Sequence, residues 1–462
     1  MSPATKHRVM SRSASRIGLA VALCTGAAGG LCQTLPEPFD VGLTYARTLY
    51  VSPGGSPEGD GSLDAPLDSI RSAVKRATPG TRIVVKAGTY TGSTSLTGLR
   101  GEPDRPIAIV AEGEVVLEAA GASTLLYGSD LRYVVIEGFT LRGAATHGIN
   151  IDDGGSYETP TEHLVLRKIT VAGAGSGGNN DCIKLSGVDH FFVLDSEAWG
   201  CNRGEIIDMV GCHNGLISGN YFHDTVANGV QAKGGSADIV IHGNLFADIP
   251  GRAVNAGGST GLEYFRPLDA PYEAARIRVL GNVFLRNGAM SGATIAYVGC
   301  DACVFAHNTV VEPKTWVARI LQESRAERFV PSRAGLFVNN VIVLRLADLR
   351  TFVNIGPGTA PETFTFGSNL WYALDRGADW TGPTLPPEIP PETGSLIQRD
   401  PRFVDPERGD YHIPLTSPAR NAGRDLALEM PPDYDGRCWA SPPTMGAFEA
   451  GLPRRGWPLV VR

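Results

Sequence analysis

The chain has 462 residues, of which 42% are hydrophobic and 19% charged, and this balance excludes an intrinsically disordered protein. The formal net charge of -7 gives no overall basic character of the kind that nucleic-acid binders show, so we expect no nucleic-acid partner. With 57 glycines and 32 prolines but no collagen-like period, the composition predicts many tight turns.

The N-terminal segment has the pattern of an export signal. A basic stretch within residues 6–16 precedes the apolar run 17–31, which ends in small residues. The run is too short to span a bilayer comfortably, and we expect no transmembrane segment elsewhere. We therefore predict a cleaved signal peptide over residues 1–33 and a secreted or periplasmic protein. Lipid anchoring at Cys24 or Cys32 is the alternative.

Residues 48–92 predict a strand, a glycine-rich loop, a helix and a second strand. The helix, at residues 67–77, repeats apolar side chains at a spacing of three and four residues. Such a helix can cover the open end of a repeat array, whose first strand otherwise exposes an unpaired edge. We expect it to be an N-terminal cap.

From residue 132 to residue 343 the chain repeats a short run of β-branched and aromatic residues followed by a turn. The runs span residues 132–141, 163–171, 190–199, 214–222, 238–246, 276–284, 302–310 and 335–343. Coils of this size cannot bury their apolar side alone, whereas stacked coils bury it together. The repeat predicts an all-β fold, a single-stranded right-handed parallel β-helix solenoid.

Asparagine recurs at one position of the repeat, at Asn220, Asn244, Asn282, Asn308 and Asn340. Asparagine tolerates the left-handed turn conformation and can bond to the asparagine of the next coil. After residue 375 the repeat is lost and the chain becomes rich in proline. We expect residues 34–375 to form the β-helix domain and residues 376–462 to form an irregular segment that covers the end of the solenoid.

Six cysteines follow residue 32, and in an exported protein disulfides are expected. They are Cys182, Cys201, Cys212, Cys300, Cys303 and Cys438. The C-x-x-C pair at 300 and 303 lacks partners at metal spacing, which favours a local disulfide or buried thiols over zinc. The pairing of the six stays open at this stage.

Three consecutive coils end in glycine at equal steps of 24 residues, at Gly187, Gly211 and Gly235. In a β-helix, equal steps stack side chains about 4.8 Å apart. This alignment places Asp181 and Glu205 in one column of side chains.

The same alignment places Lys184 and Asp208 in a second column, with Lys233 one place beyond it. Hard carboxylate oxygens suit calcium, so Asp181, Glu205 and Asp208 are candidate Ca²⁺ ligands. A lysine near other cations has a lowered pKa, which makes Lys233 a candidate base. The alternative for each of these residues is an ordinary solvated cross-strand pair.

Two insertions lengthen later coils, at residues 256–275 and 312–333. They combine aromatic rings, which stack on sugars, with arginines, which pair with acidic groups. The expected substrate-binding residues are Lys184, Tyr264, Arg266, Trp316 and Arg319. Arg252, one coil past Lys233, is a candidate catalytic clamp on a substrate carboxylate. The apolar spacing of residues 316–323 also fits a short helix packed on the flank of the solenoid.

The opening "YVSPGGSPEGDGS", the repeated "GN-x-F" coils and the closing "DPRFVD…SPARNAG" resemble exported bacterial proteins of the pectin-lyase-like β-helix superfamily, which includes polysaccharide lyases. The resemblance implies a carbohydrate ligand, commonly acidic, that lies across a face of parallel strands.

Three groups within that superfamily have local matches. "EIIDMV" and "QAKGG" resemble motifs of alginate and chondroitin lyases, with Glu205 at a calcium-binding acid, Lys233 at an arginine and Val210 at the lysine base. Lys233 with Asp208 and Asp181 is similar to the single lysine and clustered aspartates of calcium-dependent pectate lyases. "NNDCIKLSG" resembles the "DDC" motif of polygalacturonase-type hydrolases, with asparagine at the first acid.

These observations favour a polysaccharide lyase that cleaves an acidic, uronate-containing polysaccharide by β-elimination. A non-catalytic glycan-binding surface protein and a glycoside hydrolase are the alternatives. Hydrolysis by two carboxylates needs both members of the pair, and the first is replaced here.

Overall fold

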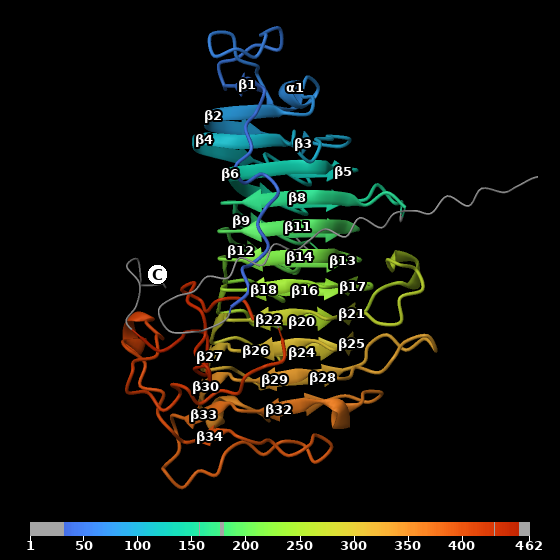
Figure 1. Ribbon diagram of the computed structural model, residues 1–462. Helices are drawn as coiled ribbons and strands as arrows, with labels where there is room; N and C mark the ends of the chain where they lie inside the picture. The colour runs from blue at the N-terminus through green and yellow to red at the C-terminus, as the bar shows by residue number, and fades with distance from the viewer. Residues whose placement is uncertain (1–31, 157, 176–179, 429, 452–462) are drawn as a thin grey trace, which may run out of the picture.

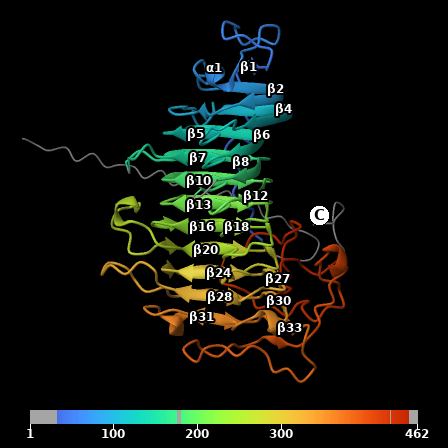
Figure 2. The ribbon, with the colours of Figure 1, turned by 180° about the vertical axis from the view of Figure 1, so that it is seen from behind.

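The strands stack in register, so that each coil of the chain lies on the one before it and forms a parallel β-solenoid (Figures 1 and 2). The computed structural model describes residues 32–156, 158–175, 180–428 and 430–451. The predicted signal peptide therefore lies outside the described residues, apart from residues 32 and 33. Within the described residues, the strands form two parallel sheets, one of 24 strands and one of ten.

The ten-stranded sheet forms one face of the solenoid, which Figure 2 shows. Its strands are β3 (Thr94–Ser95), β5 (Leu126–Ser129), β7 (Ile149–Asp152), β10 (Ile183–Ser186), β13 (Ile207–Val210), β16 (Val230–Lys233), β20 (Val254–Gly257), β24 (Ala293–Val298), β28 (Trp316–Leu321) and β31 (Val353–Ile355). In β10, for example, Ile183 and Leu185 are buried in the core and Lys184 and Ser186 alternate with them on the outer face.

The 24-stranded sheet forms the rest of the solenoid wall. Its strands are β1 (Arg47–Val51), β2 (Thr81–Thr91), β4 (Ile107–Glu118), β6 (Arg132–Ala144), β8 (Thr161–Arg167), β9 (Thr170–Ala174), β11 (Val188–Leu194), β12 (Glu197–Cys201), β14 (His213–Ser218), β15 (Tyr221–His223), β17 (Ser236–Ala237), β18 (Val240–His242), β19 (Leu245–Ala247), β21 (Ala274–Ala275), β22 (Arg278–Leu280), β23 (Val283–Leu285), β25 (Cys300–Asp301), β26 (Val304–Ala306), β27 (Thr309–Val311), β29 (Leu336–Val338), β30 (Val341–Leu344), β32 (Thr365–Gly367), β33 (Leu370–Ala373) and β34 (Leu396–Ile397).

A ladder of buried asparagines runs along one corner of the solenoid, as the sequence predicts. The side-chain amide nitrogen of each asparagine donates to the side-chain oxygen of the next one, from Asn220 through Asn244, Asn282 and Asn308. Asn340 continues the ladder to Asn369. The left-handed conformation expected for the asparagines of the ladder belongs to the residue before each of them, for example Gly281 with φ 64° before Asn282. The asparagines therefore serve as hydrogen-bonding groups.

The N-terminal end of the solenoid is closed by a helix, α1 (Ile70–Val74), which is shorter than the predicted 67–77. The Ser69 side chain caps it by accepting from the Ser72 N–H. Ile70 and Ala73 are buried in the main hydrophobic core, so the helix covers apolar side chains of the first coils. Figure 1 shows α1 beside β1 and β2 at this end.

The C-terminal segment has two parts. Ile389 joins the main core and Trp380 and Leu385 pack against it, so the proline-rich stretch closes the second end of the solenoid. Residues 411–428 and 430–448 instead lie along its flank, where they form a separate apolar cluster with strands of the 24-stranded sheet. The remaining helical turns are 3₁₀ helices: η1 (Leu262–Tyr264), η2 (Leu346–Asp348), η3 (Pro361–Thr363) and η4 (Pro406–Arg408).

Among the described residues, three disulfides link Cys32 to Cys438, Cys182 to Cys201, and Cys300 to Cys303. The last agrees with the local disulfide expected for the C-x-x-C pair. Cys212 is a buried free thiol. No helix in the described part of the chain is both long and apolar enough to span a bilayer.

Candidate functional site

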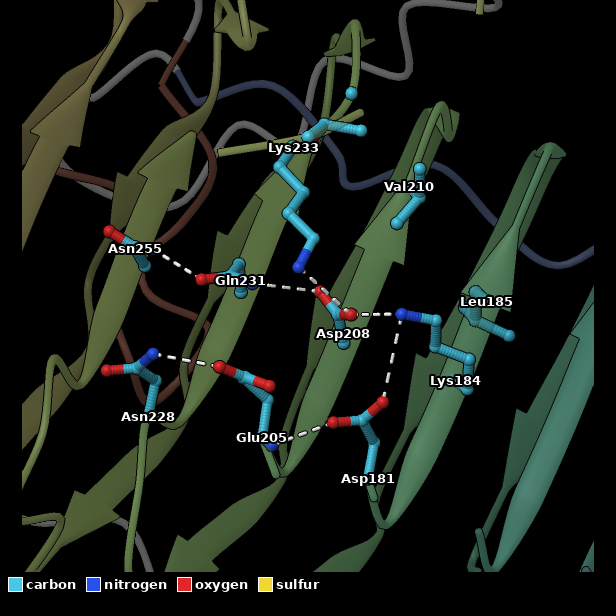
Figure 3. Close-up of polar contacts among 12 residues, drawn as sticks. Asp181, Lys184, Leu185, Glu205, Asp208, Val210, Asn228, Gln231, Lys233 and Asn255 are labelled. Carbon is cyan, nitrogen blue, oxygen red and sulfur yellow. Dashed lines mark hydrogen bonds and ion pairs between the residues drawn. The ribbon is translucent and has the colours of Figure 1, made fainter. Parts of the chain in front are cut away.

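Two columns of outward-directed side chains meet on β10, β13 and β16 of the ten-stranded sheet. One column consists of Lys184, Asp208 and Gln231, which strand pairing places side by side. The other consists of Asp181 and Glu205, at the turns that precede β10 and β13. There the Glu205 backbone N–H donates to Asp181 Oδ1 at 2.8 Å. The pairs Lys184 with Asp208 and Asp181 with Glu205 agree with the spacing of the sequence, and Figure 3 shows the two columns next to each other.

Lys233 lies on the same outer face as Asp208 because the coil that leads from β13 to β16 has 23 residues. β13 pairs with β16 through Asp208 opposite Gln231 and Val210 opposite Lys233. The step of 24 residues expected from the glycines would have placed Asp208 opposite Ala232 and turned Lys233 to the other face. The predicted position of Lys233, one place beyond the column, is therefore wrong by one residue. With the observed strand pairing, Lys233 lies at the site.

Asp181, Glu205 and Asp208 form a compact acidic group, called here the acidic triad. One carboxylate oxygen from each lies within 4.8 Å of the others. Asp181 and Asp208 have no exposed surface, and Glu205 is 9% exposed. Cys182, which follows Asp181, is tied to Cys201, so a covalent bond restrains this corner of the coil.

Two lysines balance part of this negative charge. Lys184 Nζ contacts Asp208 Oδ2 and lies 3.8 Å from Asp181 Oδ2. Lys233 Nζ lies 3.3 Å from Asp208 Oδ2. Figure 3 shows both lysines directed toward Asp208 from opposite sides. The triad and the two lysines therefore carry three acidic and two basic groups.

The surroundings shift the pKa of each carboxyl. Burial raises the pKa of Glu205 to about 7, and the charges of Asp208 and Asp181 add to that effect. Burial also raises the pKa of Asp181, again assisted by Asp208. For Asp208 burial acts in the same direction, but Lys184 and Lys233 outweigh it and lower the pKa.

Burial and electrostatics act in opposite directions on Lys184. Burial disfavours its charge, but Asp208 and Asp181 outweigh burial and raise the pKa. Lys184 is therefore held in its protonated form.

The acidic triad fits a hard cation. Asp181 Oδ2 is buried and, among the described residues, has no hydrogen-bond partner. Carboxylate oxygens are the ligands that Ca²⁺ prefers, and the two raised pKa values reflect negative charge that a cation would neutralise. The triad could therefore hold a metal ion through Asp181, Glu205 and Asp208.

A relay of amides supports Asp208 from the next two coils. Gln231 Nε2 donates to Asp208 Oδ1 at 3.0 Å, and Asn255 Nδ2 donates to Gln231 Oε1. Arg252 Nη1 in turn donates to Asn255 Oδ1 at 3.0 Å. Arg252 thus acts on the triad through the two amides, and its second nitrogen pairs with Glu323 at 2.7 Å. Gln231 and Asn255 were not predicted from the sequence.

A cleft of about 430 Å³ opens above the lysines. Lys184, Ser186, Val210 and Lys233 line it from the strands. Residues of the 256–275 insertion form the opposite wall, among them the predicted substrate-binding residues Tyr264 and Arg266. Tyr264 is 63% exposed at the rim. Arg266 is held by two hydrogen bonds to Asp189, at 2.7 and 2.8 Å.

Glu273 fixes the position of this wall. Its buried carboxylate accepts from the Gly234 N–H, next to Lys233, and from the Thr260 N–H, both at 2.9 Å. Ser324, in the second insertion, also donates to it. Both inserted loops are therefore tied to the end of β16 through one carboxylate. Sequence reasoning missed Glu273 because its partners lie 13 to 51 residues away.

Trp316 and Arg319 do not reach this cleft. They belong to β28, which is a strand of the ten-stranded sheet, so the alternative of a short helix over residues 316–323 is wrong. The strand pairs with β24 and keeps both residues on the sheet that carries the triad.

Comparison with known proteins places these features in context. Residues 49–234 match the family model described as Pel9A-like, right-handed beta helix region, and the match includes the triad and Lys233. A segment of 74 residues is 42% identical to pectate lyase PEL9 of Emericella nidulans and covers 16% of this chain and 18% of that protein. A segment of 134 residues is 25% identical to the uncharacterized protein YwoF of Bacillus subtilis and covers 27% of this chain and 28% of that protein.

The matched segments thus span less than a third of these curated relatives. The crystal structure of pectate lyase Pel9A superposes with a TM-score of 0.55 at 16% identity, over 89% of this chain and 98% of that one. At this identity the likeness concerns the fold. The chain is therefore a right-handed parallel β-helix protein, similar to polysaccharide lyases that share this fold.

Proposed function

We propose that the protein is a polysaccharide lyase that cleaves an acidic, uronate-containing polysaccharide by β-elimination. The observation that carries the proposal is the acidic triad with Lys184 and Lys233 beneath an open cleft. The Pel9A-like match, which includes all five residues, supports it.

Lys233 Nζ is the base in this proposal. It takes the proton from C5 of the uronate, a double bond forms between C4 and C5, and the bond from C4 to the bridging oxygen breaks. The leaving oxygen takes up a proton from solvent water to become a hydroxyl, and the Lys233 ammonium returns its proton to solvent. Lys184 is the less suitable base because two carboxylates hold its pKa above the usual range. Lys184 instead contributes positive charge to the substrate-binding face.

The acidic triad holds calcium in this proposal. Bound there, the ion would supply positive charge to the uronate carboxylate and to the negative charge that develops beside it. Tyr264 and Arg266 bind sugar across the cleft. Arg252 positions Asp208 through the amide relay, and this replaces its expected role as a direct clamp.

We place the protein outside the cytoplasm, as the N-terminal sequence predicts. Three disulfides support this placement, because such bonds persist in oxidising compartments. Pectate, alginate, chondroitin, hyaluronan and ulvan are the polymers to compare as substrates.

The test is the ultraviolet absorbance of unsaturated products on these five polymers, with and without calcium. We expect product with wild type and at least a hundredfold less with Lys233→Ala. Lys86→Ala, which removes a surface lysine paired with Glu112 on the 24-stranded sheet, is the matched control. New reducing ends without absorbance would indicate a hydrolase. Binding without any product would indicate a glycan-binding protein.

A further inference from the structure

The outer face of the ten-stranded sheet continues beyond the cleft to a second group of cations. Strand pairing places Asn255 opposite Ala296, and Ala296 opposite Arg319. Arg319 therefore lies in the same column as Asp208, four coils further on, or about 19 Å at the usual strand spacing. Trp316 on the same strand pairs with Ala293.

Arg319 has no counter-ion in the described part of the chain. Its guanidinium lies over the Trp316 ring, 4.2 Å from the centroid, and Nε donates to Asn354 Oδ1 at 2.9 Å. The exposed Arg350 lies over the same ring at 5.8 Å and, among the described residues, has no acidic partner either. Two guanidinium groups thus lie over one indole ring.

A third arginine adds to the positive charge around Trp316. Arg252, in the turn before β20, makes its ion pair with Glu323. Burial lowers the pKa of Arg319, and the charge of Arg252 lowers it further, against a smaller opposite effect of Glu323. Glu323 is thus already paired with Arg252 and offsets only part of the charge of Arg319. A half-buried cation without a counter-ion is costly, and an arriving anion would relieve that cost.

We propose that Arg319 and Arg350, arranged around Trp316, form a subsite that binds a carboxylate of an acidic polysaccharide remote from the cleavage point. The inference rests on the proposed function for the direction of the polymer along this face. A polymer that reaches from Lys233 to Arg319 is held at two places. A short oligosaccharide in the cleft is held at one.

The test compares binding of a long and a short probe. The variant Arg319→Gln with Arg350→Gln is prepared in a Lys233→Ala background, so that no probe is consumed. Dissociation constants are measured for pectate, alginate and chondroitin sulfate, for fully methyl-esterified pectin and for digalacturonate. We expect a ten- to hundredfold weaker affinity for the acidic polymer that binds best, with a weaker salt dependence. Digalacturonate affinity should not change.

Arg276→Gln is the matched control, because Arg276 is an exposed arginine that pairs with Asp238 on the 24-stranded sheet. It should leave every affinity unchanged. The inference is overturned if the double variant binds acidic polymers as its parent does, if digalacturonate weakens equally, or if esterified pectin weakens as much as pectate. Absence of binding of the parent to any acidic polymer overturns it as well.

Kinetic measurements distinguish this inference from the proposed function. With Lys233 restored, the two substitutions should raise KM for the polymer and leave kcat unchanged. A wild-type protein that binds acidic polymers through Arg319 but forms no unsaturated product would leave the subsite in place and reject the lyase. If the wild-type protein is a lyase and both substitutions leave its KM for the polymer unchanged, the subsite is rejected and the lyase function stands.

Discussion

Asp208 is the common partner of the two lysines in the candidate site, although it has no exposed surface. It contacts Lys184 and Lys233 and accepts a hydrogen bond from Gln231. An isolated buried carboxylate would be protonated, whereas a paired and hydrogen-bonded one stays ionised. The two lysines and the relay are thus what keep a buried anion available beneath the cleft.

Replacing Asp208 with asparagine should destabilise the protein strongly, because the change leaves two largely buried lysines without their common partner. We expect the free energy of unfolding to fall by about 3 to 5 kcal/mol, measured by chemical denaturation in the absence of calcium. Asp238→Asn breaks the exposed pair with Arg276 and should cost less than about 1 kcal/mol. Equal losses in the two variants would show that Asp208 is not the buried partner of the lysines.

A substitution at Glu205 tests directly whether the acidic triad binds calcium. Calcium at about 100 times its dissociation constant should raise the free energy of unfolding by about 2.7 kcal/mol in wild type. Glu205→Gln removes one of three carboxylates and should abolish most of that increase. Glu112→Gln, at an exposed carboxylate, should leave it intact. If calcium fails to stabilise wild type, the triad does not bind it.

At the scale of elements, the asparagine ladder explains how coils of different length stay aligned. The ladder bonds span 24, 38, 26 and 32 residues, yet their geometry is nearly constant at 2.9 to 3.3 Å. The additional residues leave the wall as loops. One such loop forms a wall of the cleft, and a second is tied to it through Glu273. The candidate cleft on this scaffold is therefore formed by an insertion between fixed corners.

Removing one asparagine from the middle of the ladder should be costly. Asn282→Ala leaves the backbone and side-chain N–H groups of Asn244 without their acceptor. Each buried group left unpaired costs about 1 to 3 kcal/mol, so we expect a loss of at least about 2 kcal/mol in chemical denaturation. Asn202→Ala, at an exposed position, should change stability by less than about 0.5 kcal/mol. A loss at Asn282 no larger than that would mean that the ladder contributes little.

The sequence predicts the repeat, and therefore the solenoid, because apolar alternation and the asparagines recur in every coil. It also predicts the columns of Asp181 with Glu205 and of Lys184 with Asp208, since those coils have equal length. It misplaces Lys233 because one coil is a residue shorter, and glycines at both 234 and 235 allow either alignment. Arg350 is not predicted because its contact with Trp316 is set by the pairing of Leu349 with Thr315.

At the scale of the whole molecule, two buried histidines connect the solenoid to the C-terminal segment. His242 Nε2 lies 2.8 Å from the Pro432 carbonyl oxygen, and His307 Nδ1 lies 3.2 Å from that of Thr444. Burial lowers the pKa of His242 to about 4 and that of His307 to about 3. Both side chains are therefore neutral where the segment is docked.

The two histidines predict a loss of stability in acid. In the unfolded chain a histidine takes up its proton near pH 6.5, whereas these two do so only near pH 4 and 3. Their contribution is therefore complete above about pH 6.5 and declines as the pH falls toward 4 and then 3. Unfolding midpoints between pH 7 and 4 should fall more steeply for wild type than for His242→Gln. Parallel curves would contradict this assignment.

The bond between Cys32 and Cys438 joins positions 406 residues apart and so closes nearly the whole chain into a covalent ring. A single cut anywhere between the two cysteines, for example in the exposed loop around Tyr264, opens that ring without releasing a fragment. The nicked protein would keep its mass under non-reducing conditions and separate into two pieces only after reduction. If the protein works outside the cell, as proposed above, this ring would let it tolerate proteolytic cuts in the loops that surround the candidate site.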